Sequence, residues 1–140
     1  MLTSPFLAER LRVAVGRLAR RLRQHIVGDL PPSQSSVLAT LDKRGPASMS
    51  RLAEIEAISR PSTTGIVSRL VEKGLVERAD NPDDGRSAIV AITLAGSELL
   101  EQRRAERDAF LARAIESLED DEQLVLARAA EIIERITAER

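Results

Sequence analysis

Short hydroxyl side chains and one arginine are grouped between residues 62 and 69, and this group is the part of the sequence best suited to bind a ligand. Its members are Ser62, Thr63, Thr64, Ser68 and Arg69, together with Gly65, which lies among them. The apolar residues among and just after them are Ile66, Val67, Leu70 and Val71. Their spacing is that of one helix, which would bury them and leave the polar group outside. Hydroxyls and a guanidinium on such a face can hydrogen-bond phosphates and base edges.

These polar residues also have simpler interpretations. Ser62 could be a helix cap, and Thr63 and Thr64 could be surface residues without a ligand. Arg69 is the best candidate for a contact with a base or a phosphate. Other cations that could contact phosphates are Arg51, Arg60, Lys73 and Arg78.

The sequence lacks the residue types of most catalytic and metal centres. It contains no cysteine, which excludes thiolate nucleophiles, disulfides and cysteine-ligated metals. His25 is the only histidine, and we interpret it as an ordinary residue near a helix end, with a ligand contact as the alternative. Carboxylates are numerous, but no nucleophile or phosphate-binding loop accompanies them. We therefore expect no catalytic residues, no bound metal and no enzyme.

Length and composition indicate one domain over residues 1–140. The chain has 43% hydrophobic and 31% charged residues. No apolar run approaches the roughly 20 residues that span a bilayer, and no signal peptide is evident, so we expect a cytoplasmic protein without membrane contact. With two Phe and no Tyr or Trp, we do not expect an aromatic platform for single-stranded nucleic acid.

The net charge of −1 is unevenly distributed along the chain. Residues 1–30 contain six arginines and two acids, whereas residues 91–140 contain seven arginines and twelve acids. Such a chain can present one face to a polyanion and remain soluble.

The apolar pattern predicts a mainly α fold with one small β-hairpin. Four helices are expected first: one from Leu7 to Ile26, a second capped by Ser33 and ended by Gly45, a third capped by Ser48, and a fourth from Pro61 to Gly74. The two strands of the hairpin are expected at 75–79 and 87–93. A fifth helix capped by Thr93 and a sixth that starts at 119–122 would follow. The helix after Thr93 has a charged middle, 101–108, and is expected to bridge two parts of the molecule. The last helix is expected to bury Leu124, Ala127, Ile132 and Ile136 or their neighbours.

Several motifs together resemble a known family. They are Leu52-Ala53, Arg60 to Thr64, Arg69 to Arg78, Pro82 to Arg86, Thr93 and Gly96. This combination resembles the winged helix-turn-helix of the MarR family of bacterial transcriptional regulators. The resemblance covers residues 33–97 in motif and the whole chain in element order. It implies a DNA-binding lobe at 33–93 and a helical dimerisation region made of 1–30 and 94–140.

The resemblance also assigns roles to residues. The helix that carries Ser62 to Arg69 would enter the major groove of double-stranded DNA. At the hairpin tip, Arg86 would reach the minor groove while Asp84 orients it, although the pair could be only a turn staple. Two glycines depart from the family pattern, because Gly65 and Gly85 stand where relatives often carry longer polar or basic side chains.

The function implied is that of a homodimeric repressor that binds a palindromic operator. Apolar residues on the first and last helices would otherwise lie exposed, and a partner would cover them. The family also implies regulation by a small lipophilic or aromatic-acid effector, with no cofactor. The alternative is a helical protein-interaction module that keeps the winged-helix fold, which the glycines at 65 and 85 would favour.

Overall fold

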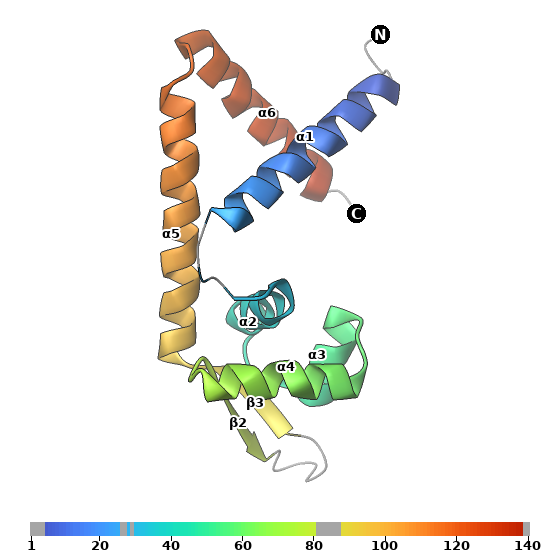
Figure 1. Ribbon diagram of the computed structural model, residues 1–140. Coiled ribbons are helices and arrows are strands. Elements are labelled where there is room, and N and C mark those ends of the chain that lie inside the picture. The colour runs from blue at the N-terminus through green and yellow to red at the C-terminus, as the bar shows by residue number, and fades with distance from the viewer. Residues whose placement is uncertain (1–4, 26–27, 29, 81–87, 139–140) are drawn as a thin grey trace. The chain divides into compact units, whose positions relative to one another are not determined.

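The computed structural model describes residues 5–25, 28, 30–80 and 88–138 as a mainly helical chain with one small sheet (Figure 1). In chain order the elements are α1 (Pro5–Gln24), α2 (Pro32–Arg44), β1 (Ala47–Ser48), α3 (Met49–Glu56), α4 (Arg60–Glu72), β2 (Val76–Asp80), β3 (Ala88–Ile92), α5 (Leu94–Glu116) and α6 (Asp120–Ala138). The predicted fold class, helical with a small hairpin, is confirmed.

The chain divides into two compact units. The central unit is Val27–Arg104, and the terminal unit combines Met1–Ile26 with Ala105–Arg140. The expected DNA-binding lobe, 33–93, falls inside the central unit, which also takes in the first part of α5. The boundary between the units lies in the charged middle of α5, the segment expected to bridge two parts of the molecule.

Serine caps begin two helices of the central unit. Ser48 accepts a backbone N–H at 3.1 Å at the start of α3, as predicted, and Ser59 accepts one at 3.2 Å at the start of α4. The predicted Ser33 cap of α2 is wrong. This helix begins at Pro32, and Pro31 at its N-cap makes no side-chain bond. Proline suits the first helical turn because its fixed φ is close to the helical value and its missing N–H would have no helical partner there.

The sheet of the central unit has the order β1-β3-β2, and both strand pairs are antiparallel. In the hairpin, Val76 lies opposite Ile92 and Asp80 opposite Ala88, so the predicted hairpin is confirmed. The sequence did not predict β1. This strand has two residues, which is too few to show an alternating pattern, and it ties the start of α3 to the sheet.

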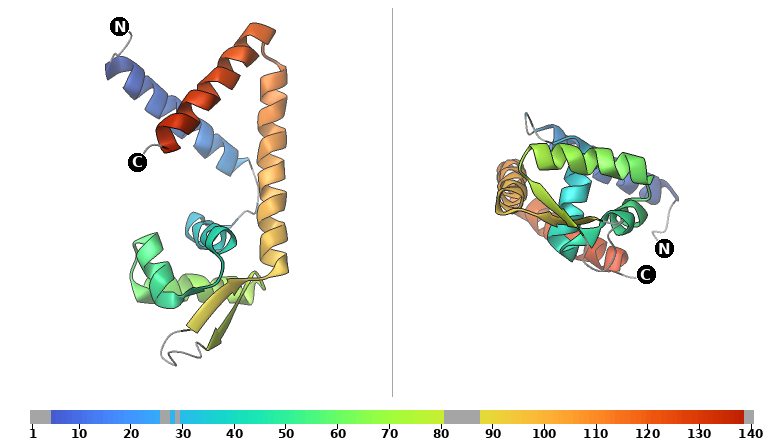
Figure 2. Two further views of the ribbon diagram at one scale, coloured as in Figure 1. Left: turned by 180° about the vertical axis from the view of Figure 1, so that it is seen from behind. Right: turned by 90° about the horizontal axis from the view of Figure 1, so that it is seen from below.

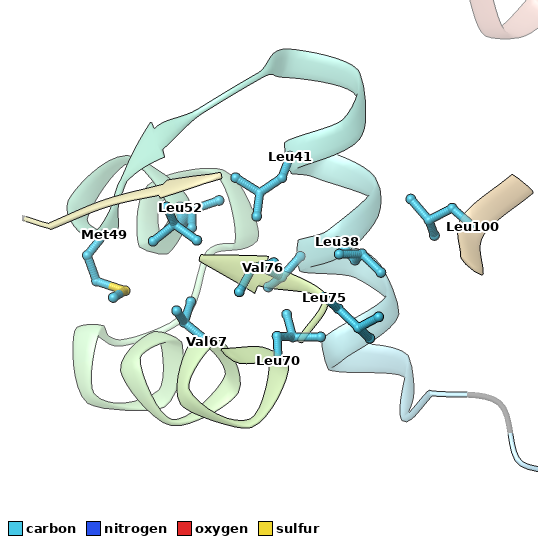
Figure 3. Close-up of a cluster of buried hydrophobic side chains, with 11 residues drawn as sticks. Leu38, Leu41, Met49, Leu52, Val67, Leu70, Leu75, Val76 and Leu100 are labelled. Carbon is cyan, nitrogen blue, oxygen red and sulfur yellow. The ribbon is translucent and has the colours of Figure 1, made fainter. Parts of the chain in front are cut away.

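An apolar cluster from four helices and the sheet forms the core of the central unit (Figure 3). Its members are Val37, Leu38, Leu41, Met49, Leu52, Val67, Leu70, Leu75, Val76, Val90 and Leu100. Val67 and Leu70 come from α4, and both are fully buried. The core therefore determines which side of α4 faces outward.

Residues 74–75, which follow α4, lie beside residues 93–96 at the start of α5 and form a short junction between the two helices. Gly74 follows α4 in the left-handed conformation, with a φ of 74°, and the N–H of Leu75 donates to the carbonyl of Leu70 at 3.0 Å. Thr93 caps α5 as predicted, because its Oγ1 accepts from the Gly96 N–H at 3.1 Å. The same hydroxyl donates to the Gly74 carbonyl at 2.7 Å.

The terminal unit contains α1, the second part of α5 and α6, and no residue of α1 or α6 is buried. Both α1 and α6 carry an apolar stripe. The α1 stripe is Leu7, Leu11, Val15, Leu18 and Leu22, and the α6 stripe is Val125, Ala129, Ile132 and Ile136. The expected burial of α6 side chains does not occur within one chain, since Leu124 is 73% exposed and Ile136 is 59% exposed. None of the described helices has both the length and the apolar composition of a membrane span.

Candidate nucleic-acid interface

Helices α3 and α4 are joined by a tight turn and have the layout of a helix-turn-helix. Ala57 ends α3 in the left-handed conformation, with a φ of 55°, and Ser59 then caps α4. Pro61 lies in the first turn of α4, where its missing N–H has no helical partner to lose. Helix α4 packs against α2 and α3 (Figure 2), and its buried side is held by Val67 and Leu70.

Most of the predicted site residues on α4 face outward. Ser62, Thr64, Gly65 and Arg69 are exposed, and Ser68 is half-buried. The cap of α4 is Ser59, so the simpler interpretation of Ser62 as the cap is wrong. The Ser59 hydroxyl donates to the Ser62 Oγ at 2.9 Å, which leaves the Ser62 hydroxyl hydrogen available as an outward donor.

Thr63 is a correction to the predicted site. Its side chain is fully buried, and its Oγ1 donates to the Ser59 carbonyl at 2.9 Å. A side chain in this position cannot contact DNA. The helical spacing contained the signal, because Thr63 lies four residues before Val67 on the stripe that packs into the core.

The predicted phosphate-binding cations are in different surroundings. Arg60 and Arg78 are exposed, and Arg51 is exposed and paired with Glu54 at 3.1 Å. The Lys73 ammonium donates to Oε1 of Gln34 at 2.6 Å, and Gln34 is only 3% exposed. Lys73 therefore ties the end of α4 to α2, in addition to any role toward phosphate.

Glu56 is a positioning residue that the sequence analysis missed. Its carboxylate accepts from Ser36 Oγ and from Thr40 Oγ1, both at 2.6 Å. These bonds hold the end of α3 to α2 immediately before the turn into α4. No sequence pattern pointed to them, because the partners lie 20 and 16 residues away along the chain.

The hairpin tip that carries Asp84 and Arg86 lies outside the described residues, so their predicted roles stay predictions. The flanking strands are described: β2 ends at Asp80 and β3 begins at Ala88. The exposed polar residues of α4 can bind a polyanion, because they offer hydroxyls and a guanidinium. In the described part of the chain, no group of three or more His, Asp or Glu residues is placed to hold a metal ion.

Comparisons with known proteins agree with this geometry. The MarR family model matches residues 30–88, which run from before α2 to the start of β3. The chain is also 35% identical over 128 residues to an uncharacterized HTH-type transcriptional regulator of Mycobacterium leprae, a match that covers 91% of this chain and 90% of that protein. The chain belongs to the MarR family of transcriptional regulators.

Two further matches extend the family relationship. The HTH-type transcriptional repressor MdtR of Bacillus subtilis is 33% identical over 116 residues, which covers 78% of this chain and 75% of that protein. A crystal structure of a transcriptional regulator protein from Pseudomonas aeruginosa has a TM-score of 0.85 and 30% identity, and the match covers 100% of both chains. The expected function class, a MarR-family regulator rather than an enzyme, is confirmed.

Proposed function

We propose that this MarR-family regulator is a homodimeric repressor that inserts α4 into the major groove of a palindromic DNA operator. The outward face of α4 carries the proposal, because Ser62, Thr64 and Arg69 are exposed while the opposite side is packed into the core. A major groove about 12 Å wide admits one helix. The short hydroxyls and the guanidinium can then reach base edges and phosphates.

Residues outside α4 extend the contact along the duplex. At the tip of the β2–β3 hairpin, Arg86 enters the adjacent minor groove and Asp84 orients its guanidinium by a charge-assisted pair. The exposed cations that contact phosphates in this proposal are Arg51, Arg60 and Arg78. Lys73 joins them through the N–H groups that Gln34 does not use.

A second copy of this chain covers the apolar stripes of the terminal unit. Leu11 is 41% exposed, Val15 is 44% exposed and Val125 is 66% exposed in a single chain. Contiguous apolar surface of this kind marks an interface. A two-fold dimer then places two α4 helices in half-sites about one helical turn apart, roughly 34–36 Å. The repressor role is supported by the name of the relative MdtR.

Replacing Arg69 by alanine is expected to weaken operator binding about 30-fold or more, because the dimer loses one base or phosphate contact of about 1–3 kcal/mol in each half-site. Fluorescence anisotropy with a labelled fragment from upstream of the protein's own gene measures the dissociation constant across a series of salt concentrations. If Arg69 contacts a phosphate, the slope of log affinity against log salt becomes shallower by about 1.8, which is about 0.9 for each of the two arginines of the dimer; if it contacts a base, the slope is unchanged.

Arg113→Ala is the matched control for that measurement. Arg113 is an exposed arginine of α5 in the terminal unit, so its loss removes the same charge from outside the unit that contains α4. Operator binding by this variant should equal that of the wild type. Failure of the folded wild-type dimer to bind any DNA at low salt would contradict the proposal and favour the protein-interaction module.

We also propose that a small aromatic or lipophilic acid regulates binding from the terminal unit. Support comes from a depression of about 260 Å³ lined by Arg21, Gln24, His25 and Phe110. The rings of His25 and Phe110 are tilted, with centroids 4.2 Å apart. Arg21 supplies a cation for a carboxylate, and the rings supply an aromatic wall for a single-ring acid.

Benzoate titration tests this part of the proposal. Benzoate is expected to raise the midpoint of thermal unfolding of the wild type and to weaken operator binding, because a ligand stabilises the state that binds it. Both effects should be lost in Arg21→Ala and kept in Arg17→Ala, which removes an arginine that does not line this depression. Equal effects of benzoate on wild type and Arg21→Ala would contradict the assignment.

A further inference from the structure

Gly65 has no structural reason to be glycine within the described chain. It lies in the interior of α4, where glycine is the poorest helix former after proline. Its φ is not positive, and a Cβ built on it meets nothing within 4 Å. Gly96 is the opposite case, since its Cβ would lie 2.2 Å from the backbone oxygen of Leu75. Within the described chain, the space beside position 65 is therefore open to something that binds to α4.

Gly65 occupies the centre of the outward face of α4. It is two residues from both Thr63 and Val67, the buried residues on either side of it, and so points about 160° away from each around the helix. One turn away on the same face are Ser62 and Ser68. A side chain at position 65 would project directly toward a surface that approaches this face.

The side chains three residues before and after Gly65 are short, whereas Arg69, four residues after it, is long and exposed and can extend to one side. Ser62 is exposed and Ser68 is half-buried, and a serine hydroxyl extends only one atom beyond Cβ. Such hydroxyls reach base edges only when the helix backbone itself comes close to the floor of the groove. A bare Cα at the centre of the face permits that approach, whereas any side chain there would hold the helix away.

We infer that Gly65 sets the depth at which α4 enters the major groove. Recognition of the operator sequence then depends on the nearby serines, Ser62 and Ser68. This rests on the proposed function, because the approaching surface is taken to be the operator. In this arrangement the glycine makes the helix less stable in the free protein, but it allows the backbone of α4 to come close to the operator. Stability and operator affinity therefore respond in opposite directions to the same substitution.

Gly65→Ala tests the inference. The variant is expected to raise the midpoint of thermal unfolding by about 2–4 °C, because alanine favours the helix. Operator affinity is expected to fall about 30-fold, because one base contact is lost in each of the two half-sites, while affinity for non-operator DNA of equal length stays unchanged. In a double-mutant cycle, Ser68→Ala is expected to weaken operator binding when position 65 is glycine and to have no further effect when position 65 is alanine.

Gly16→Ala is the matched control. Gly16 is also an interior helix glycine with no neighbour within 4 Å, but it lies in α1 about 140° from the middle of the α1 stripe. This variant should gain stability and keep wild-type operator affinity, with its dimeric state checked by sedimentation. If Gly65→Ala binds the operator with the affinity of the wild type, the inference about Gly65 is wrong, but the proposed function still stands. A wild type that binds no DNA overturns the proposed function as well.

Discussion

Alanine at position 96 is expected to lower the free energy of unfolding by about 3 kcal/mol, the upper part of the range for forcing atoms into a packed site. An added Cβ would lie 2.2 Å from the Leu75 oxygen and 2.8 Å from Cγ1 of Ile92. The closer neighbour is backbone, so it cannot move aside as a flexible side chain could. The junction between α4 and α5 must open instead, and this strains the hydrogen bond that the Thr93 N–H donates to the Leu75 carbonyl. Urea denaturation followed by circular dichroism measures the change.

Gly65→Ala is the control for this experiment, since it makes the same chemical change in a helix with open space around it. It should stabilise the protein by up to about 1 kcal/mol, the difference in helix propensity. Gly96→Ala with wild-type stability would show that the junction can relax. The close approach of α5 to Leu75 would then not be a constraint on the fold.

Aspartate at both Leu11 and Ile136 is expected to convert the proposed dimer to monomers and to weaken operator binding by about 100-fold or more, because a monomer loses the gain from joining two half-sites. Both side chains are exposed in the single chain, 41% and 59% respectively. Their replacement therefore removes no contact of the core of the central unit, but it places charges in the interface that the second copy would bury. Sedimentation velocity gives the oligomeric state, and anisotropy gives the affinity.

Ala127→Asp is the matched control for this pair. Ala127 is exposed on α6, roughly opposite the α6 stripe around the helix, so the same charge is introduced where no partner is expected. This variant should remain dimeric and bind the operator. A Leu11→Asp, Ile136→Asp variant that stays dimeric would mean that the two copies associate through another surface.

Local signals in the sequence predicted most of the elements of the central unit. The caps at Ser48 and Thr93 act over three residues, and the left-handed glycine at 74 acts on its immediate neighbours. Each is therefore visible in a short window of sequence. Interpretation failed where two signals competed, as for Thr63, whose residue type indicates a surface position while its helical spacing indicates the core. Burial of Thr63 shows that spacing was the stronger guide.

Contacts between distant segments could not be predicted in this way. Lys73 is bonded to Gln34 across 39 residues, and Glu56 holds Ser36 and Thr40 on α2. Nothing in the sequence relates such partners, because they meet only after the helices have packed on the core.

The sequence by itself therefore determined the order of helices and strands, the turns between them and the polar residues available on α4, since these depend on periodicity and on bonds between near neighbours. The tertiary structure alone decided which side chains of α2 hold Glu56 and Lys73, and why Gly96 must lack a side chain. Those properties depend on the direction from which another segment approaches, and a linear pattern does not contain that direction.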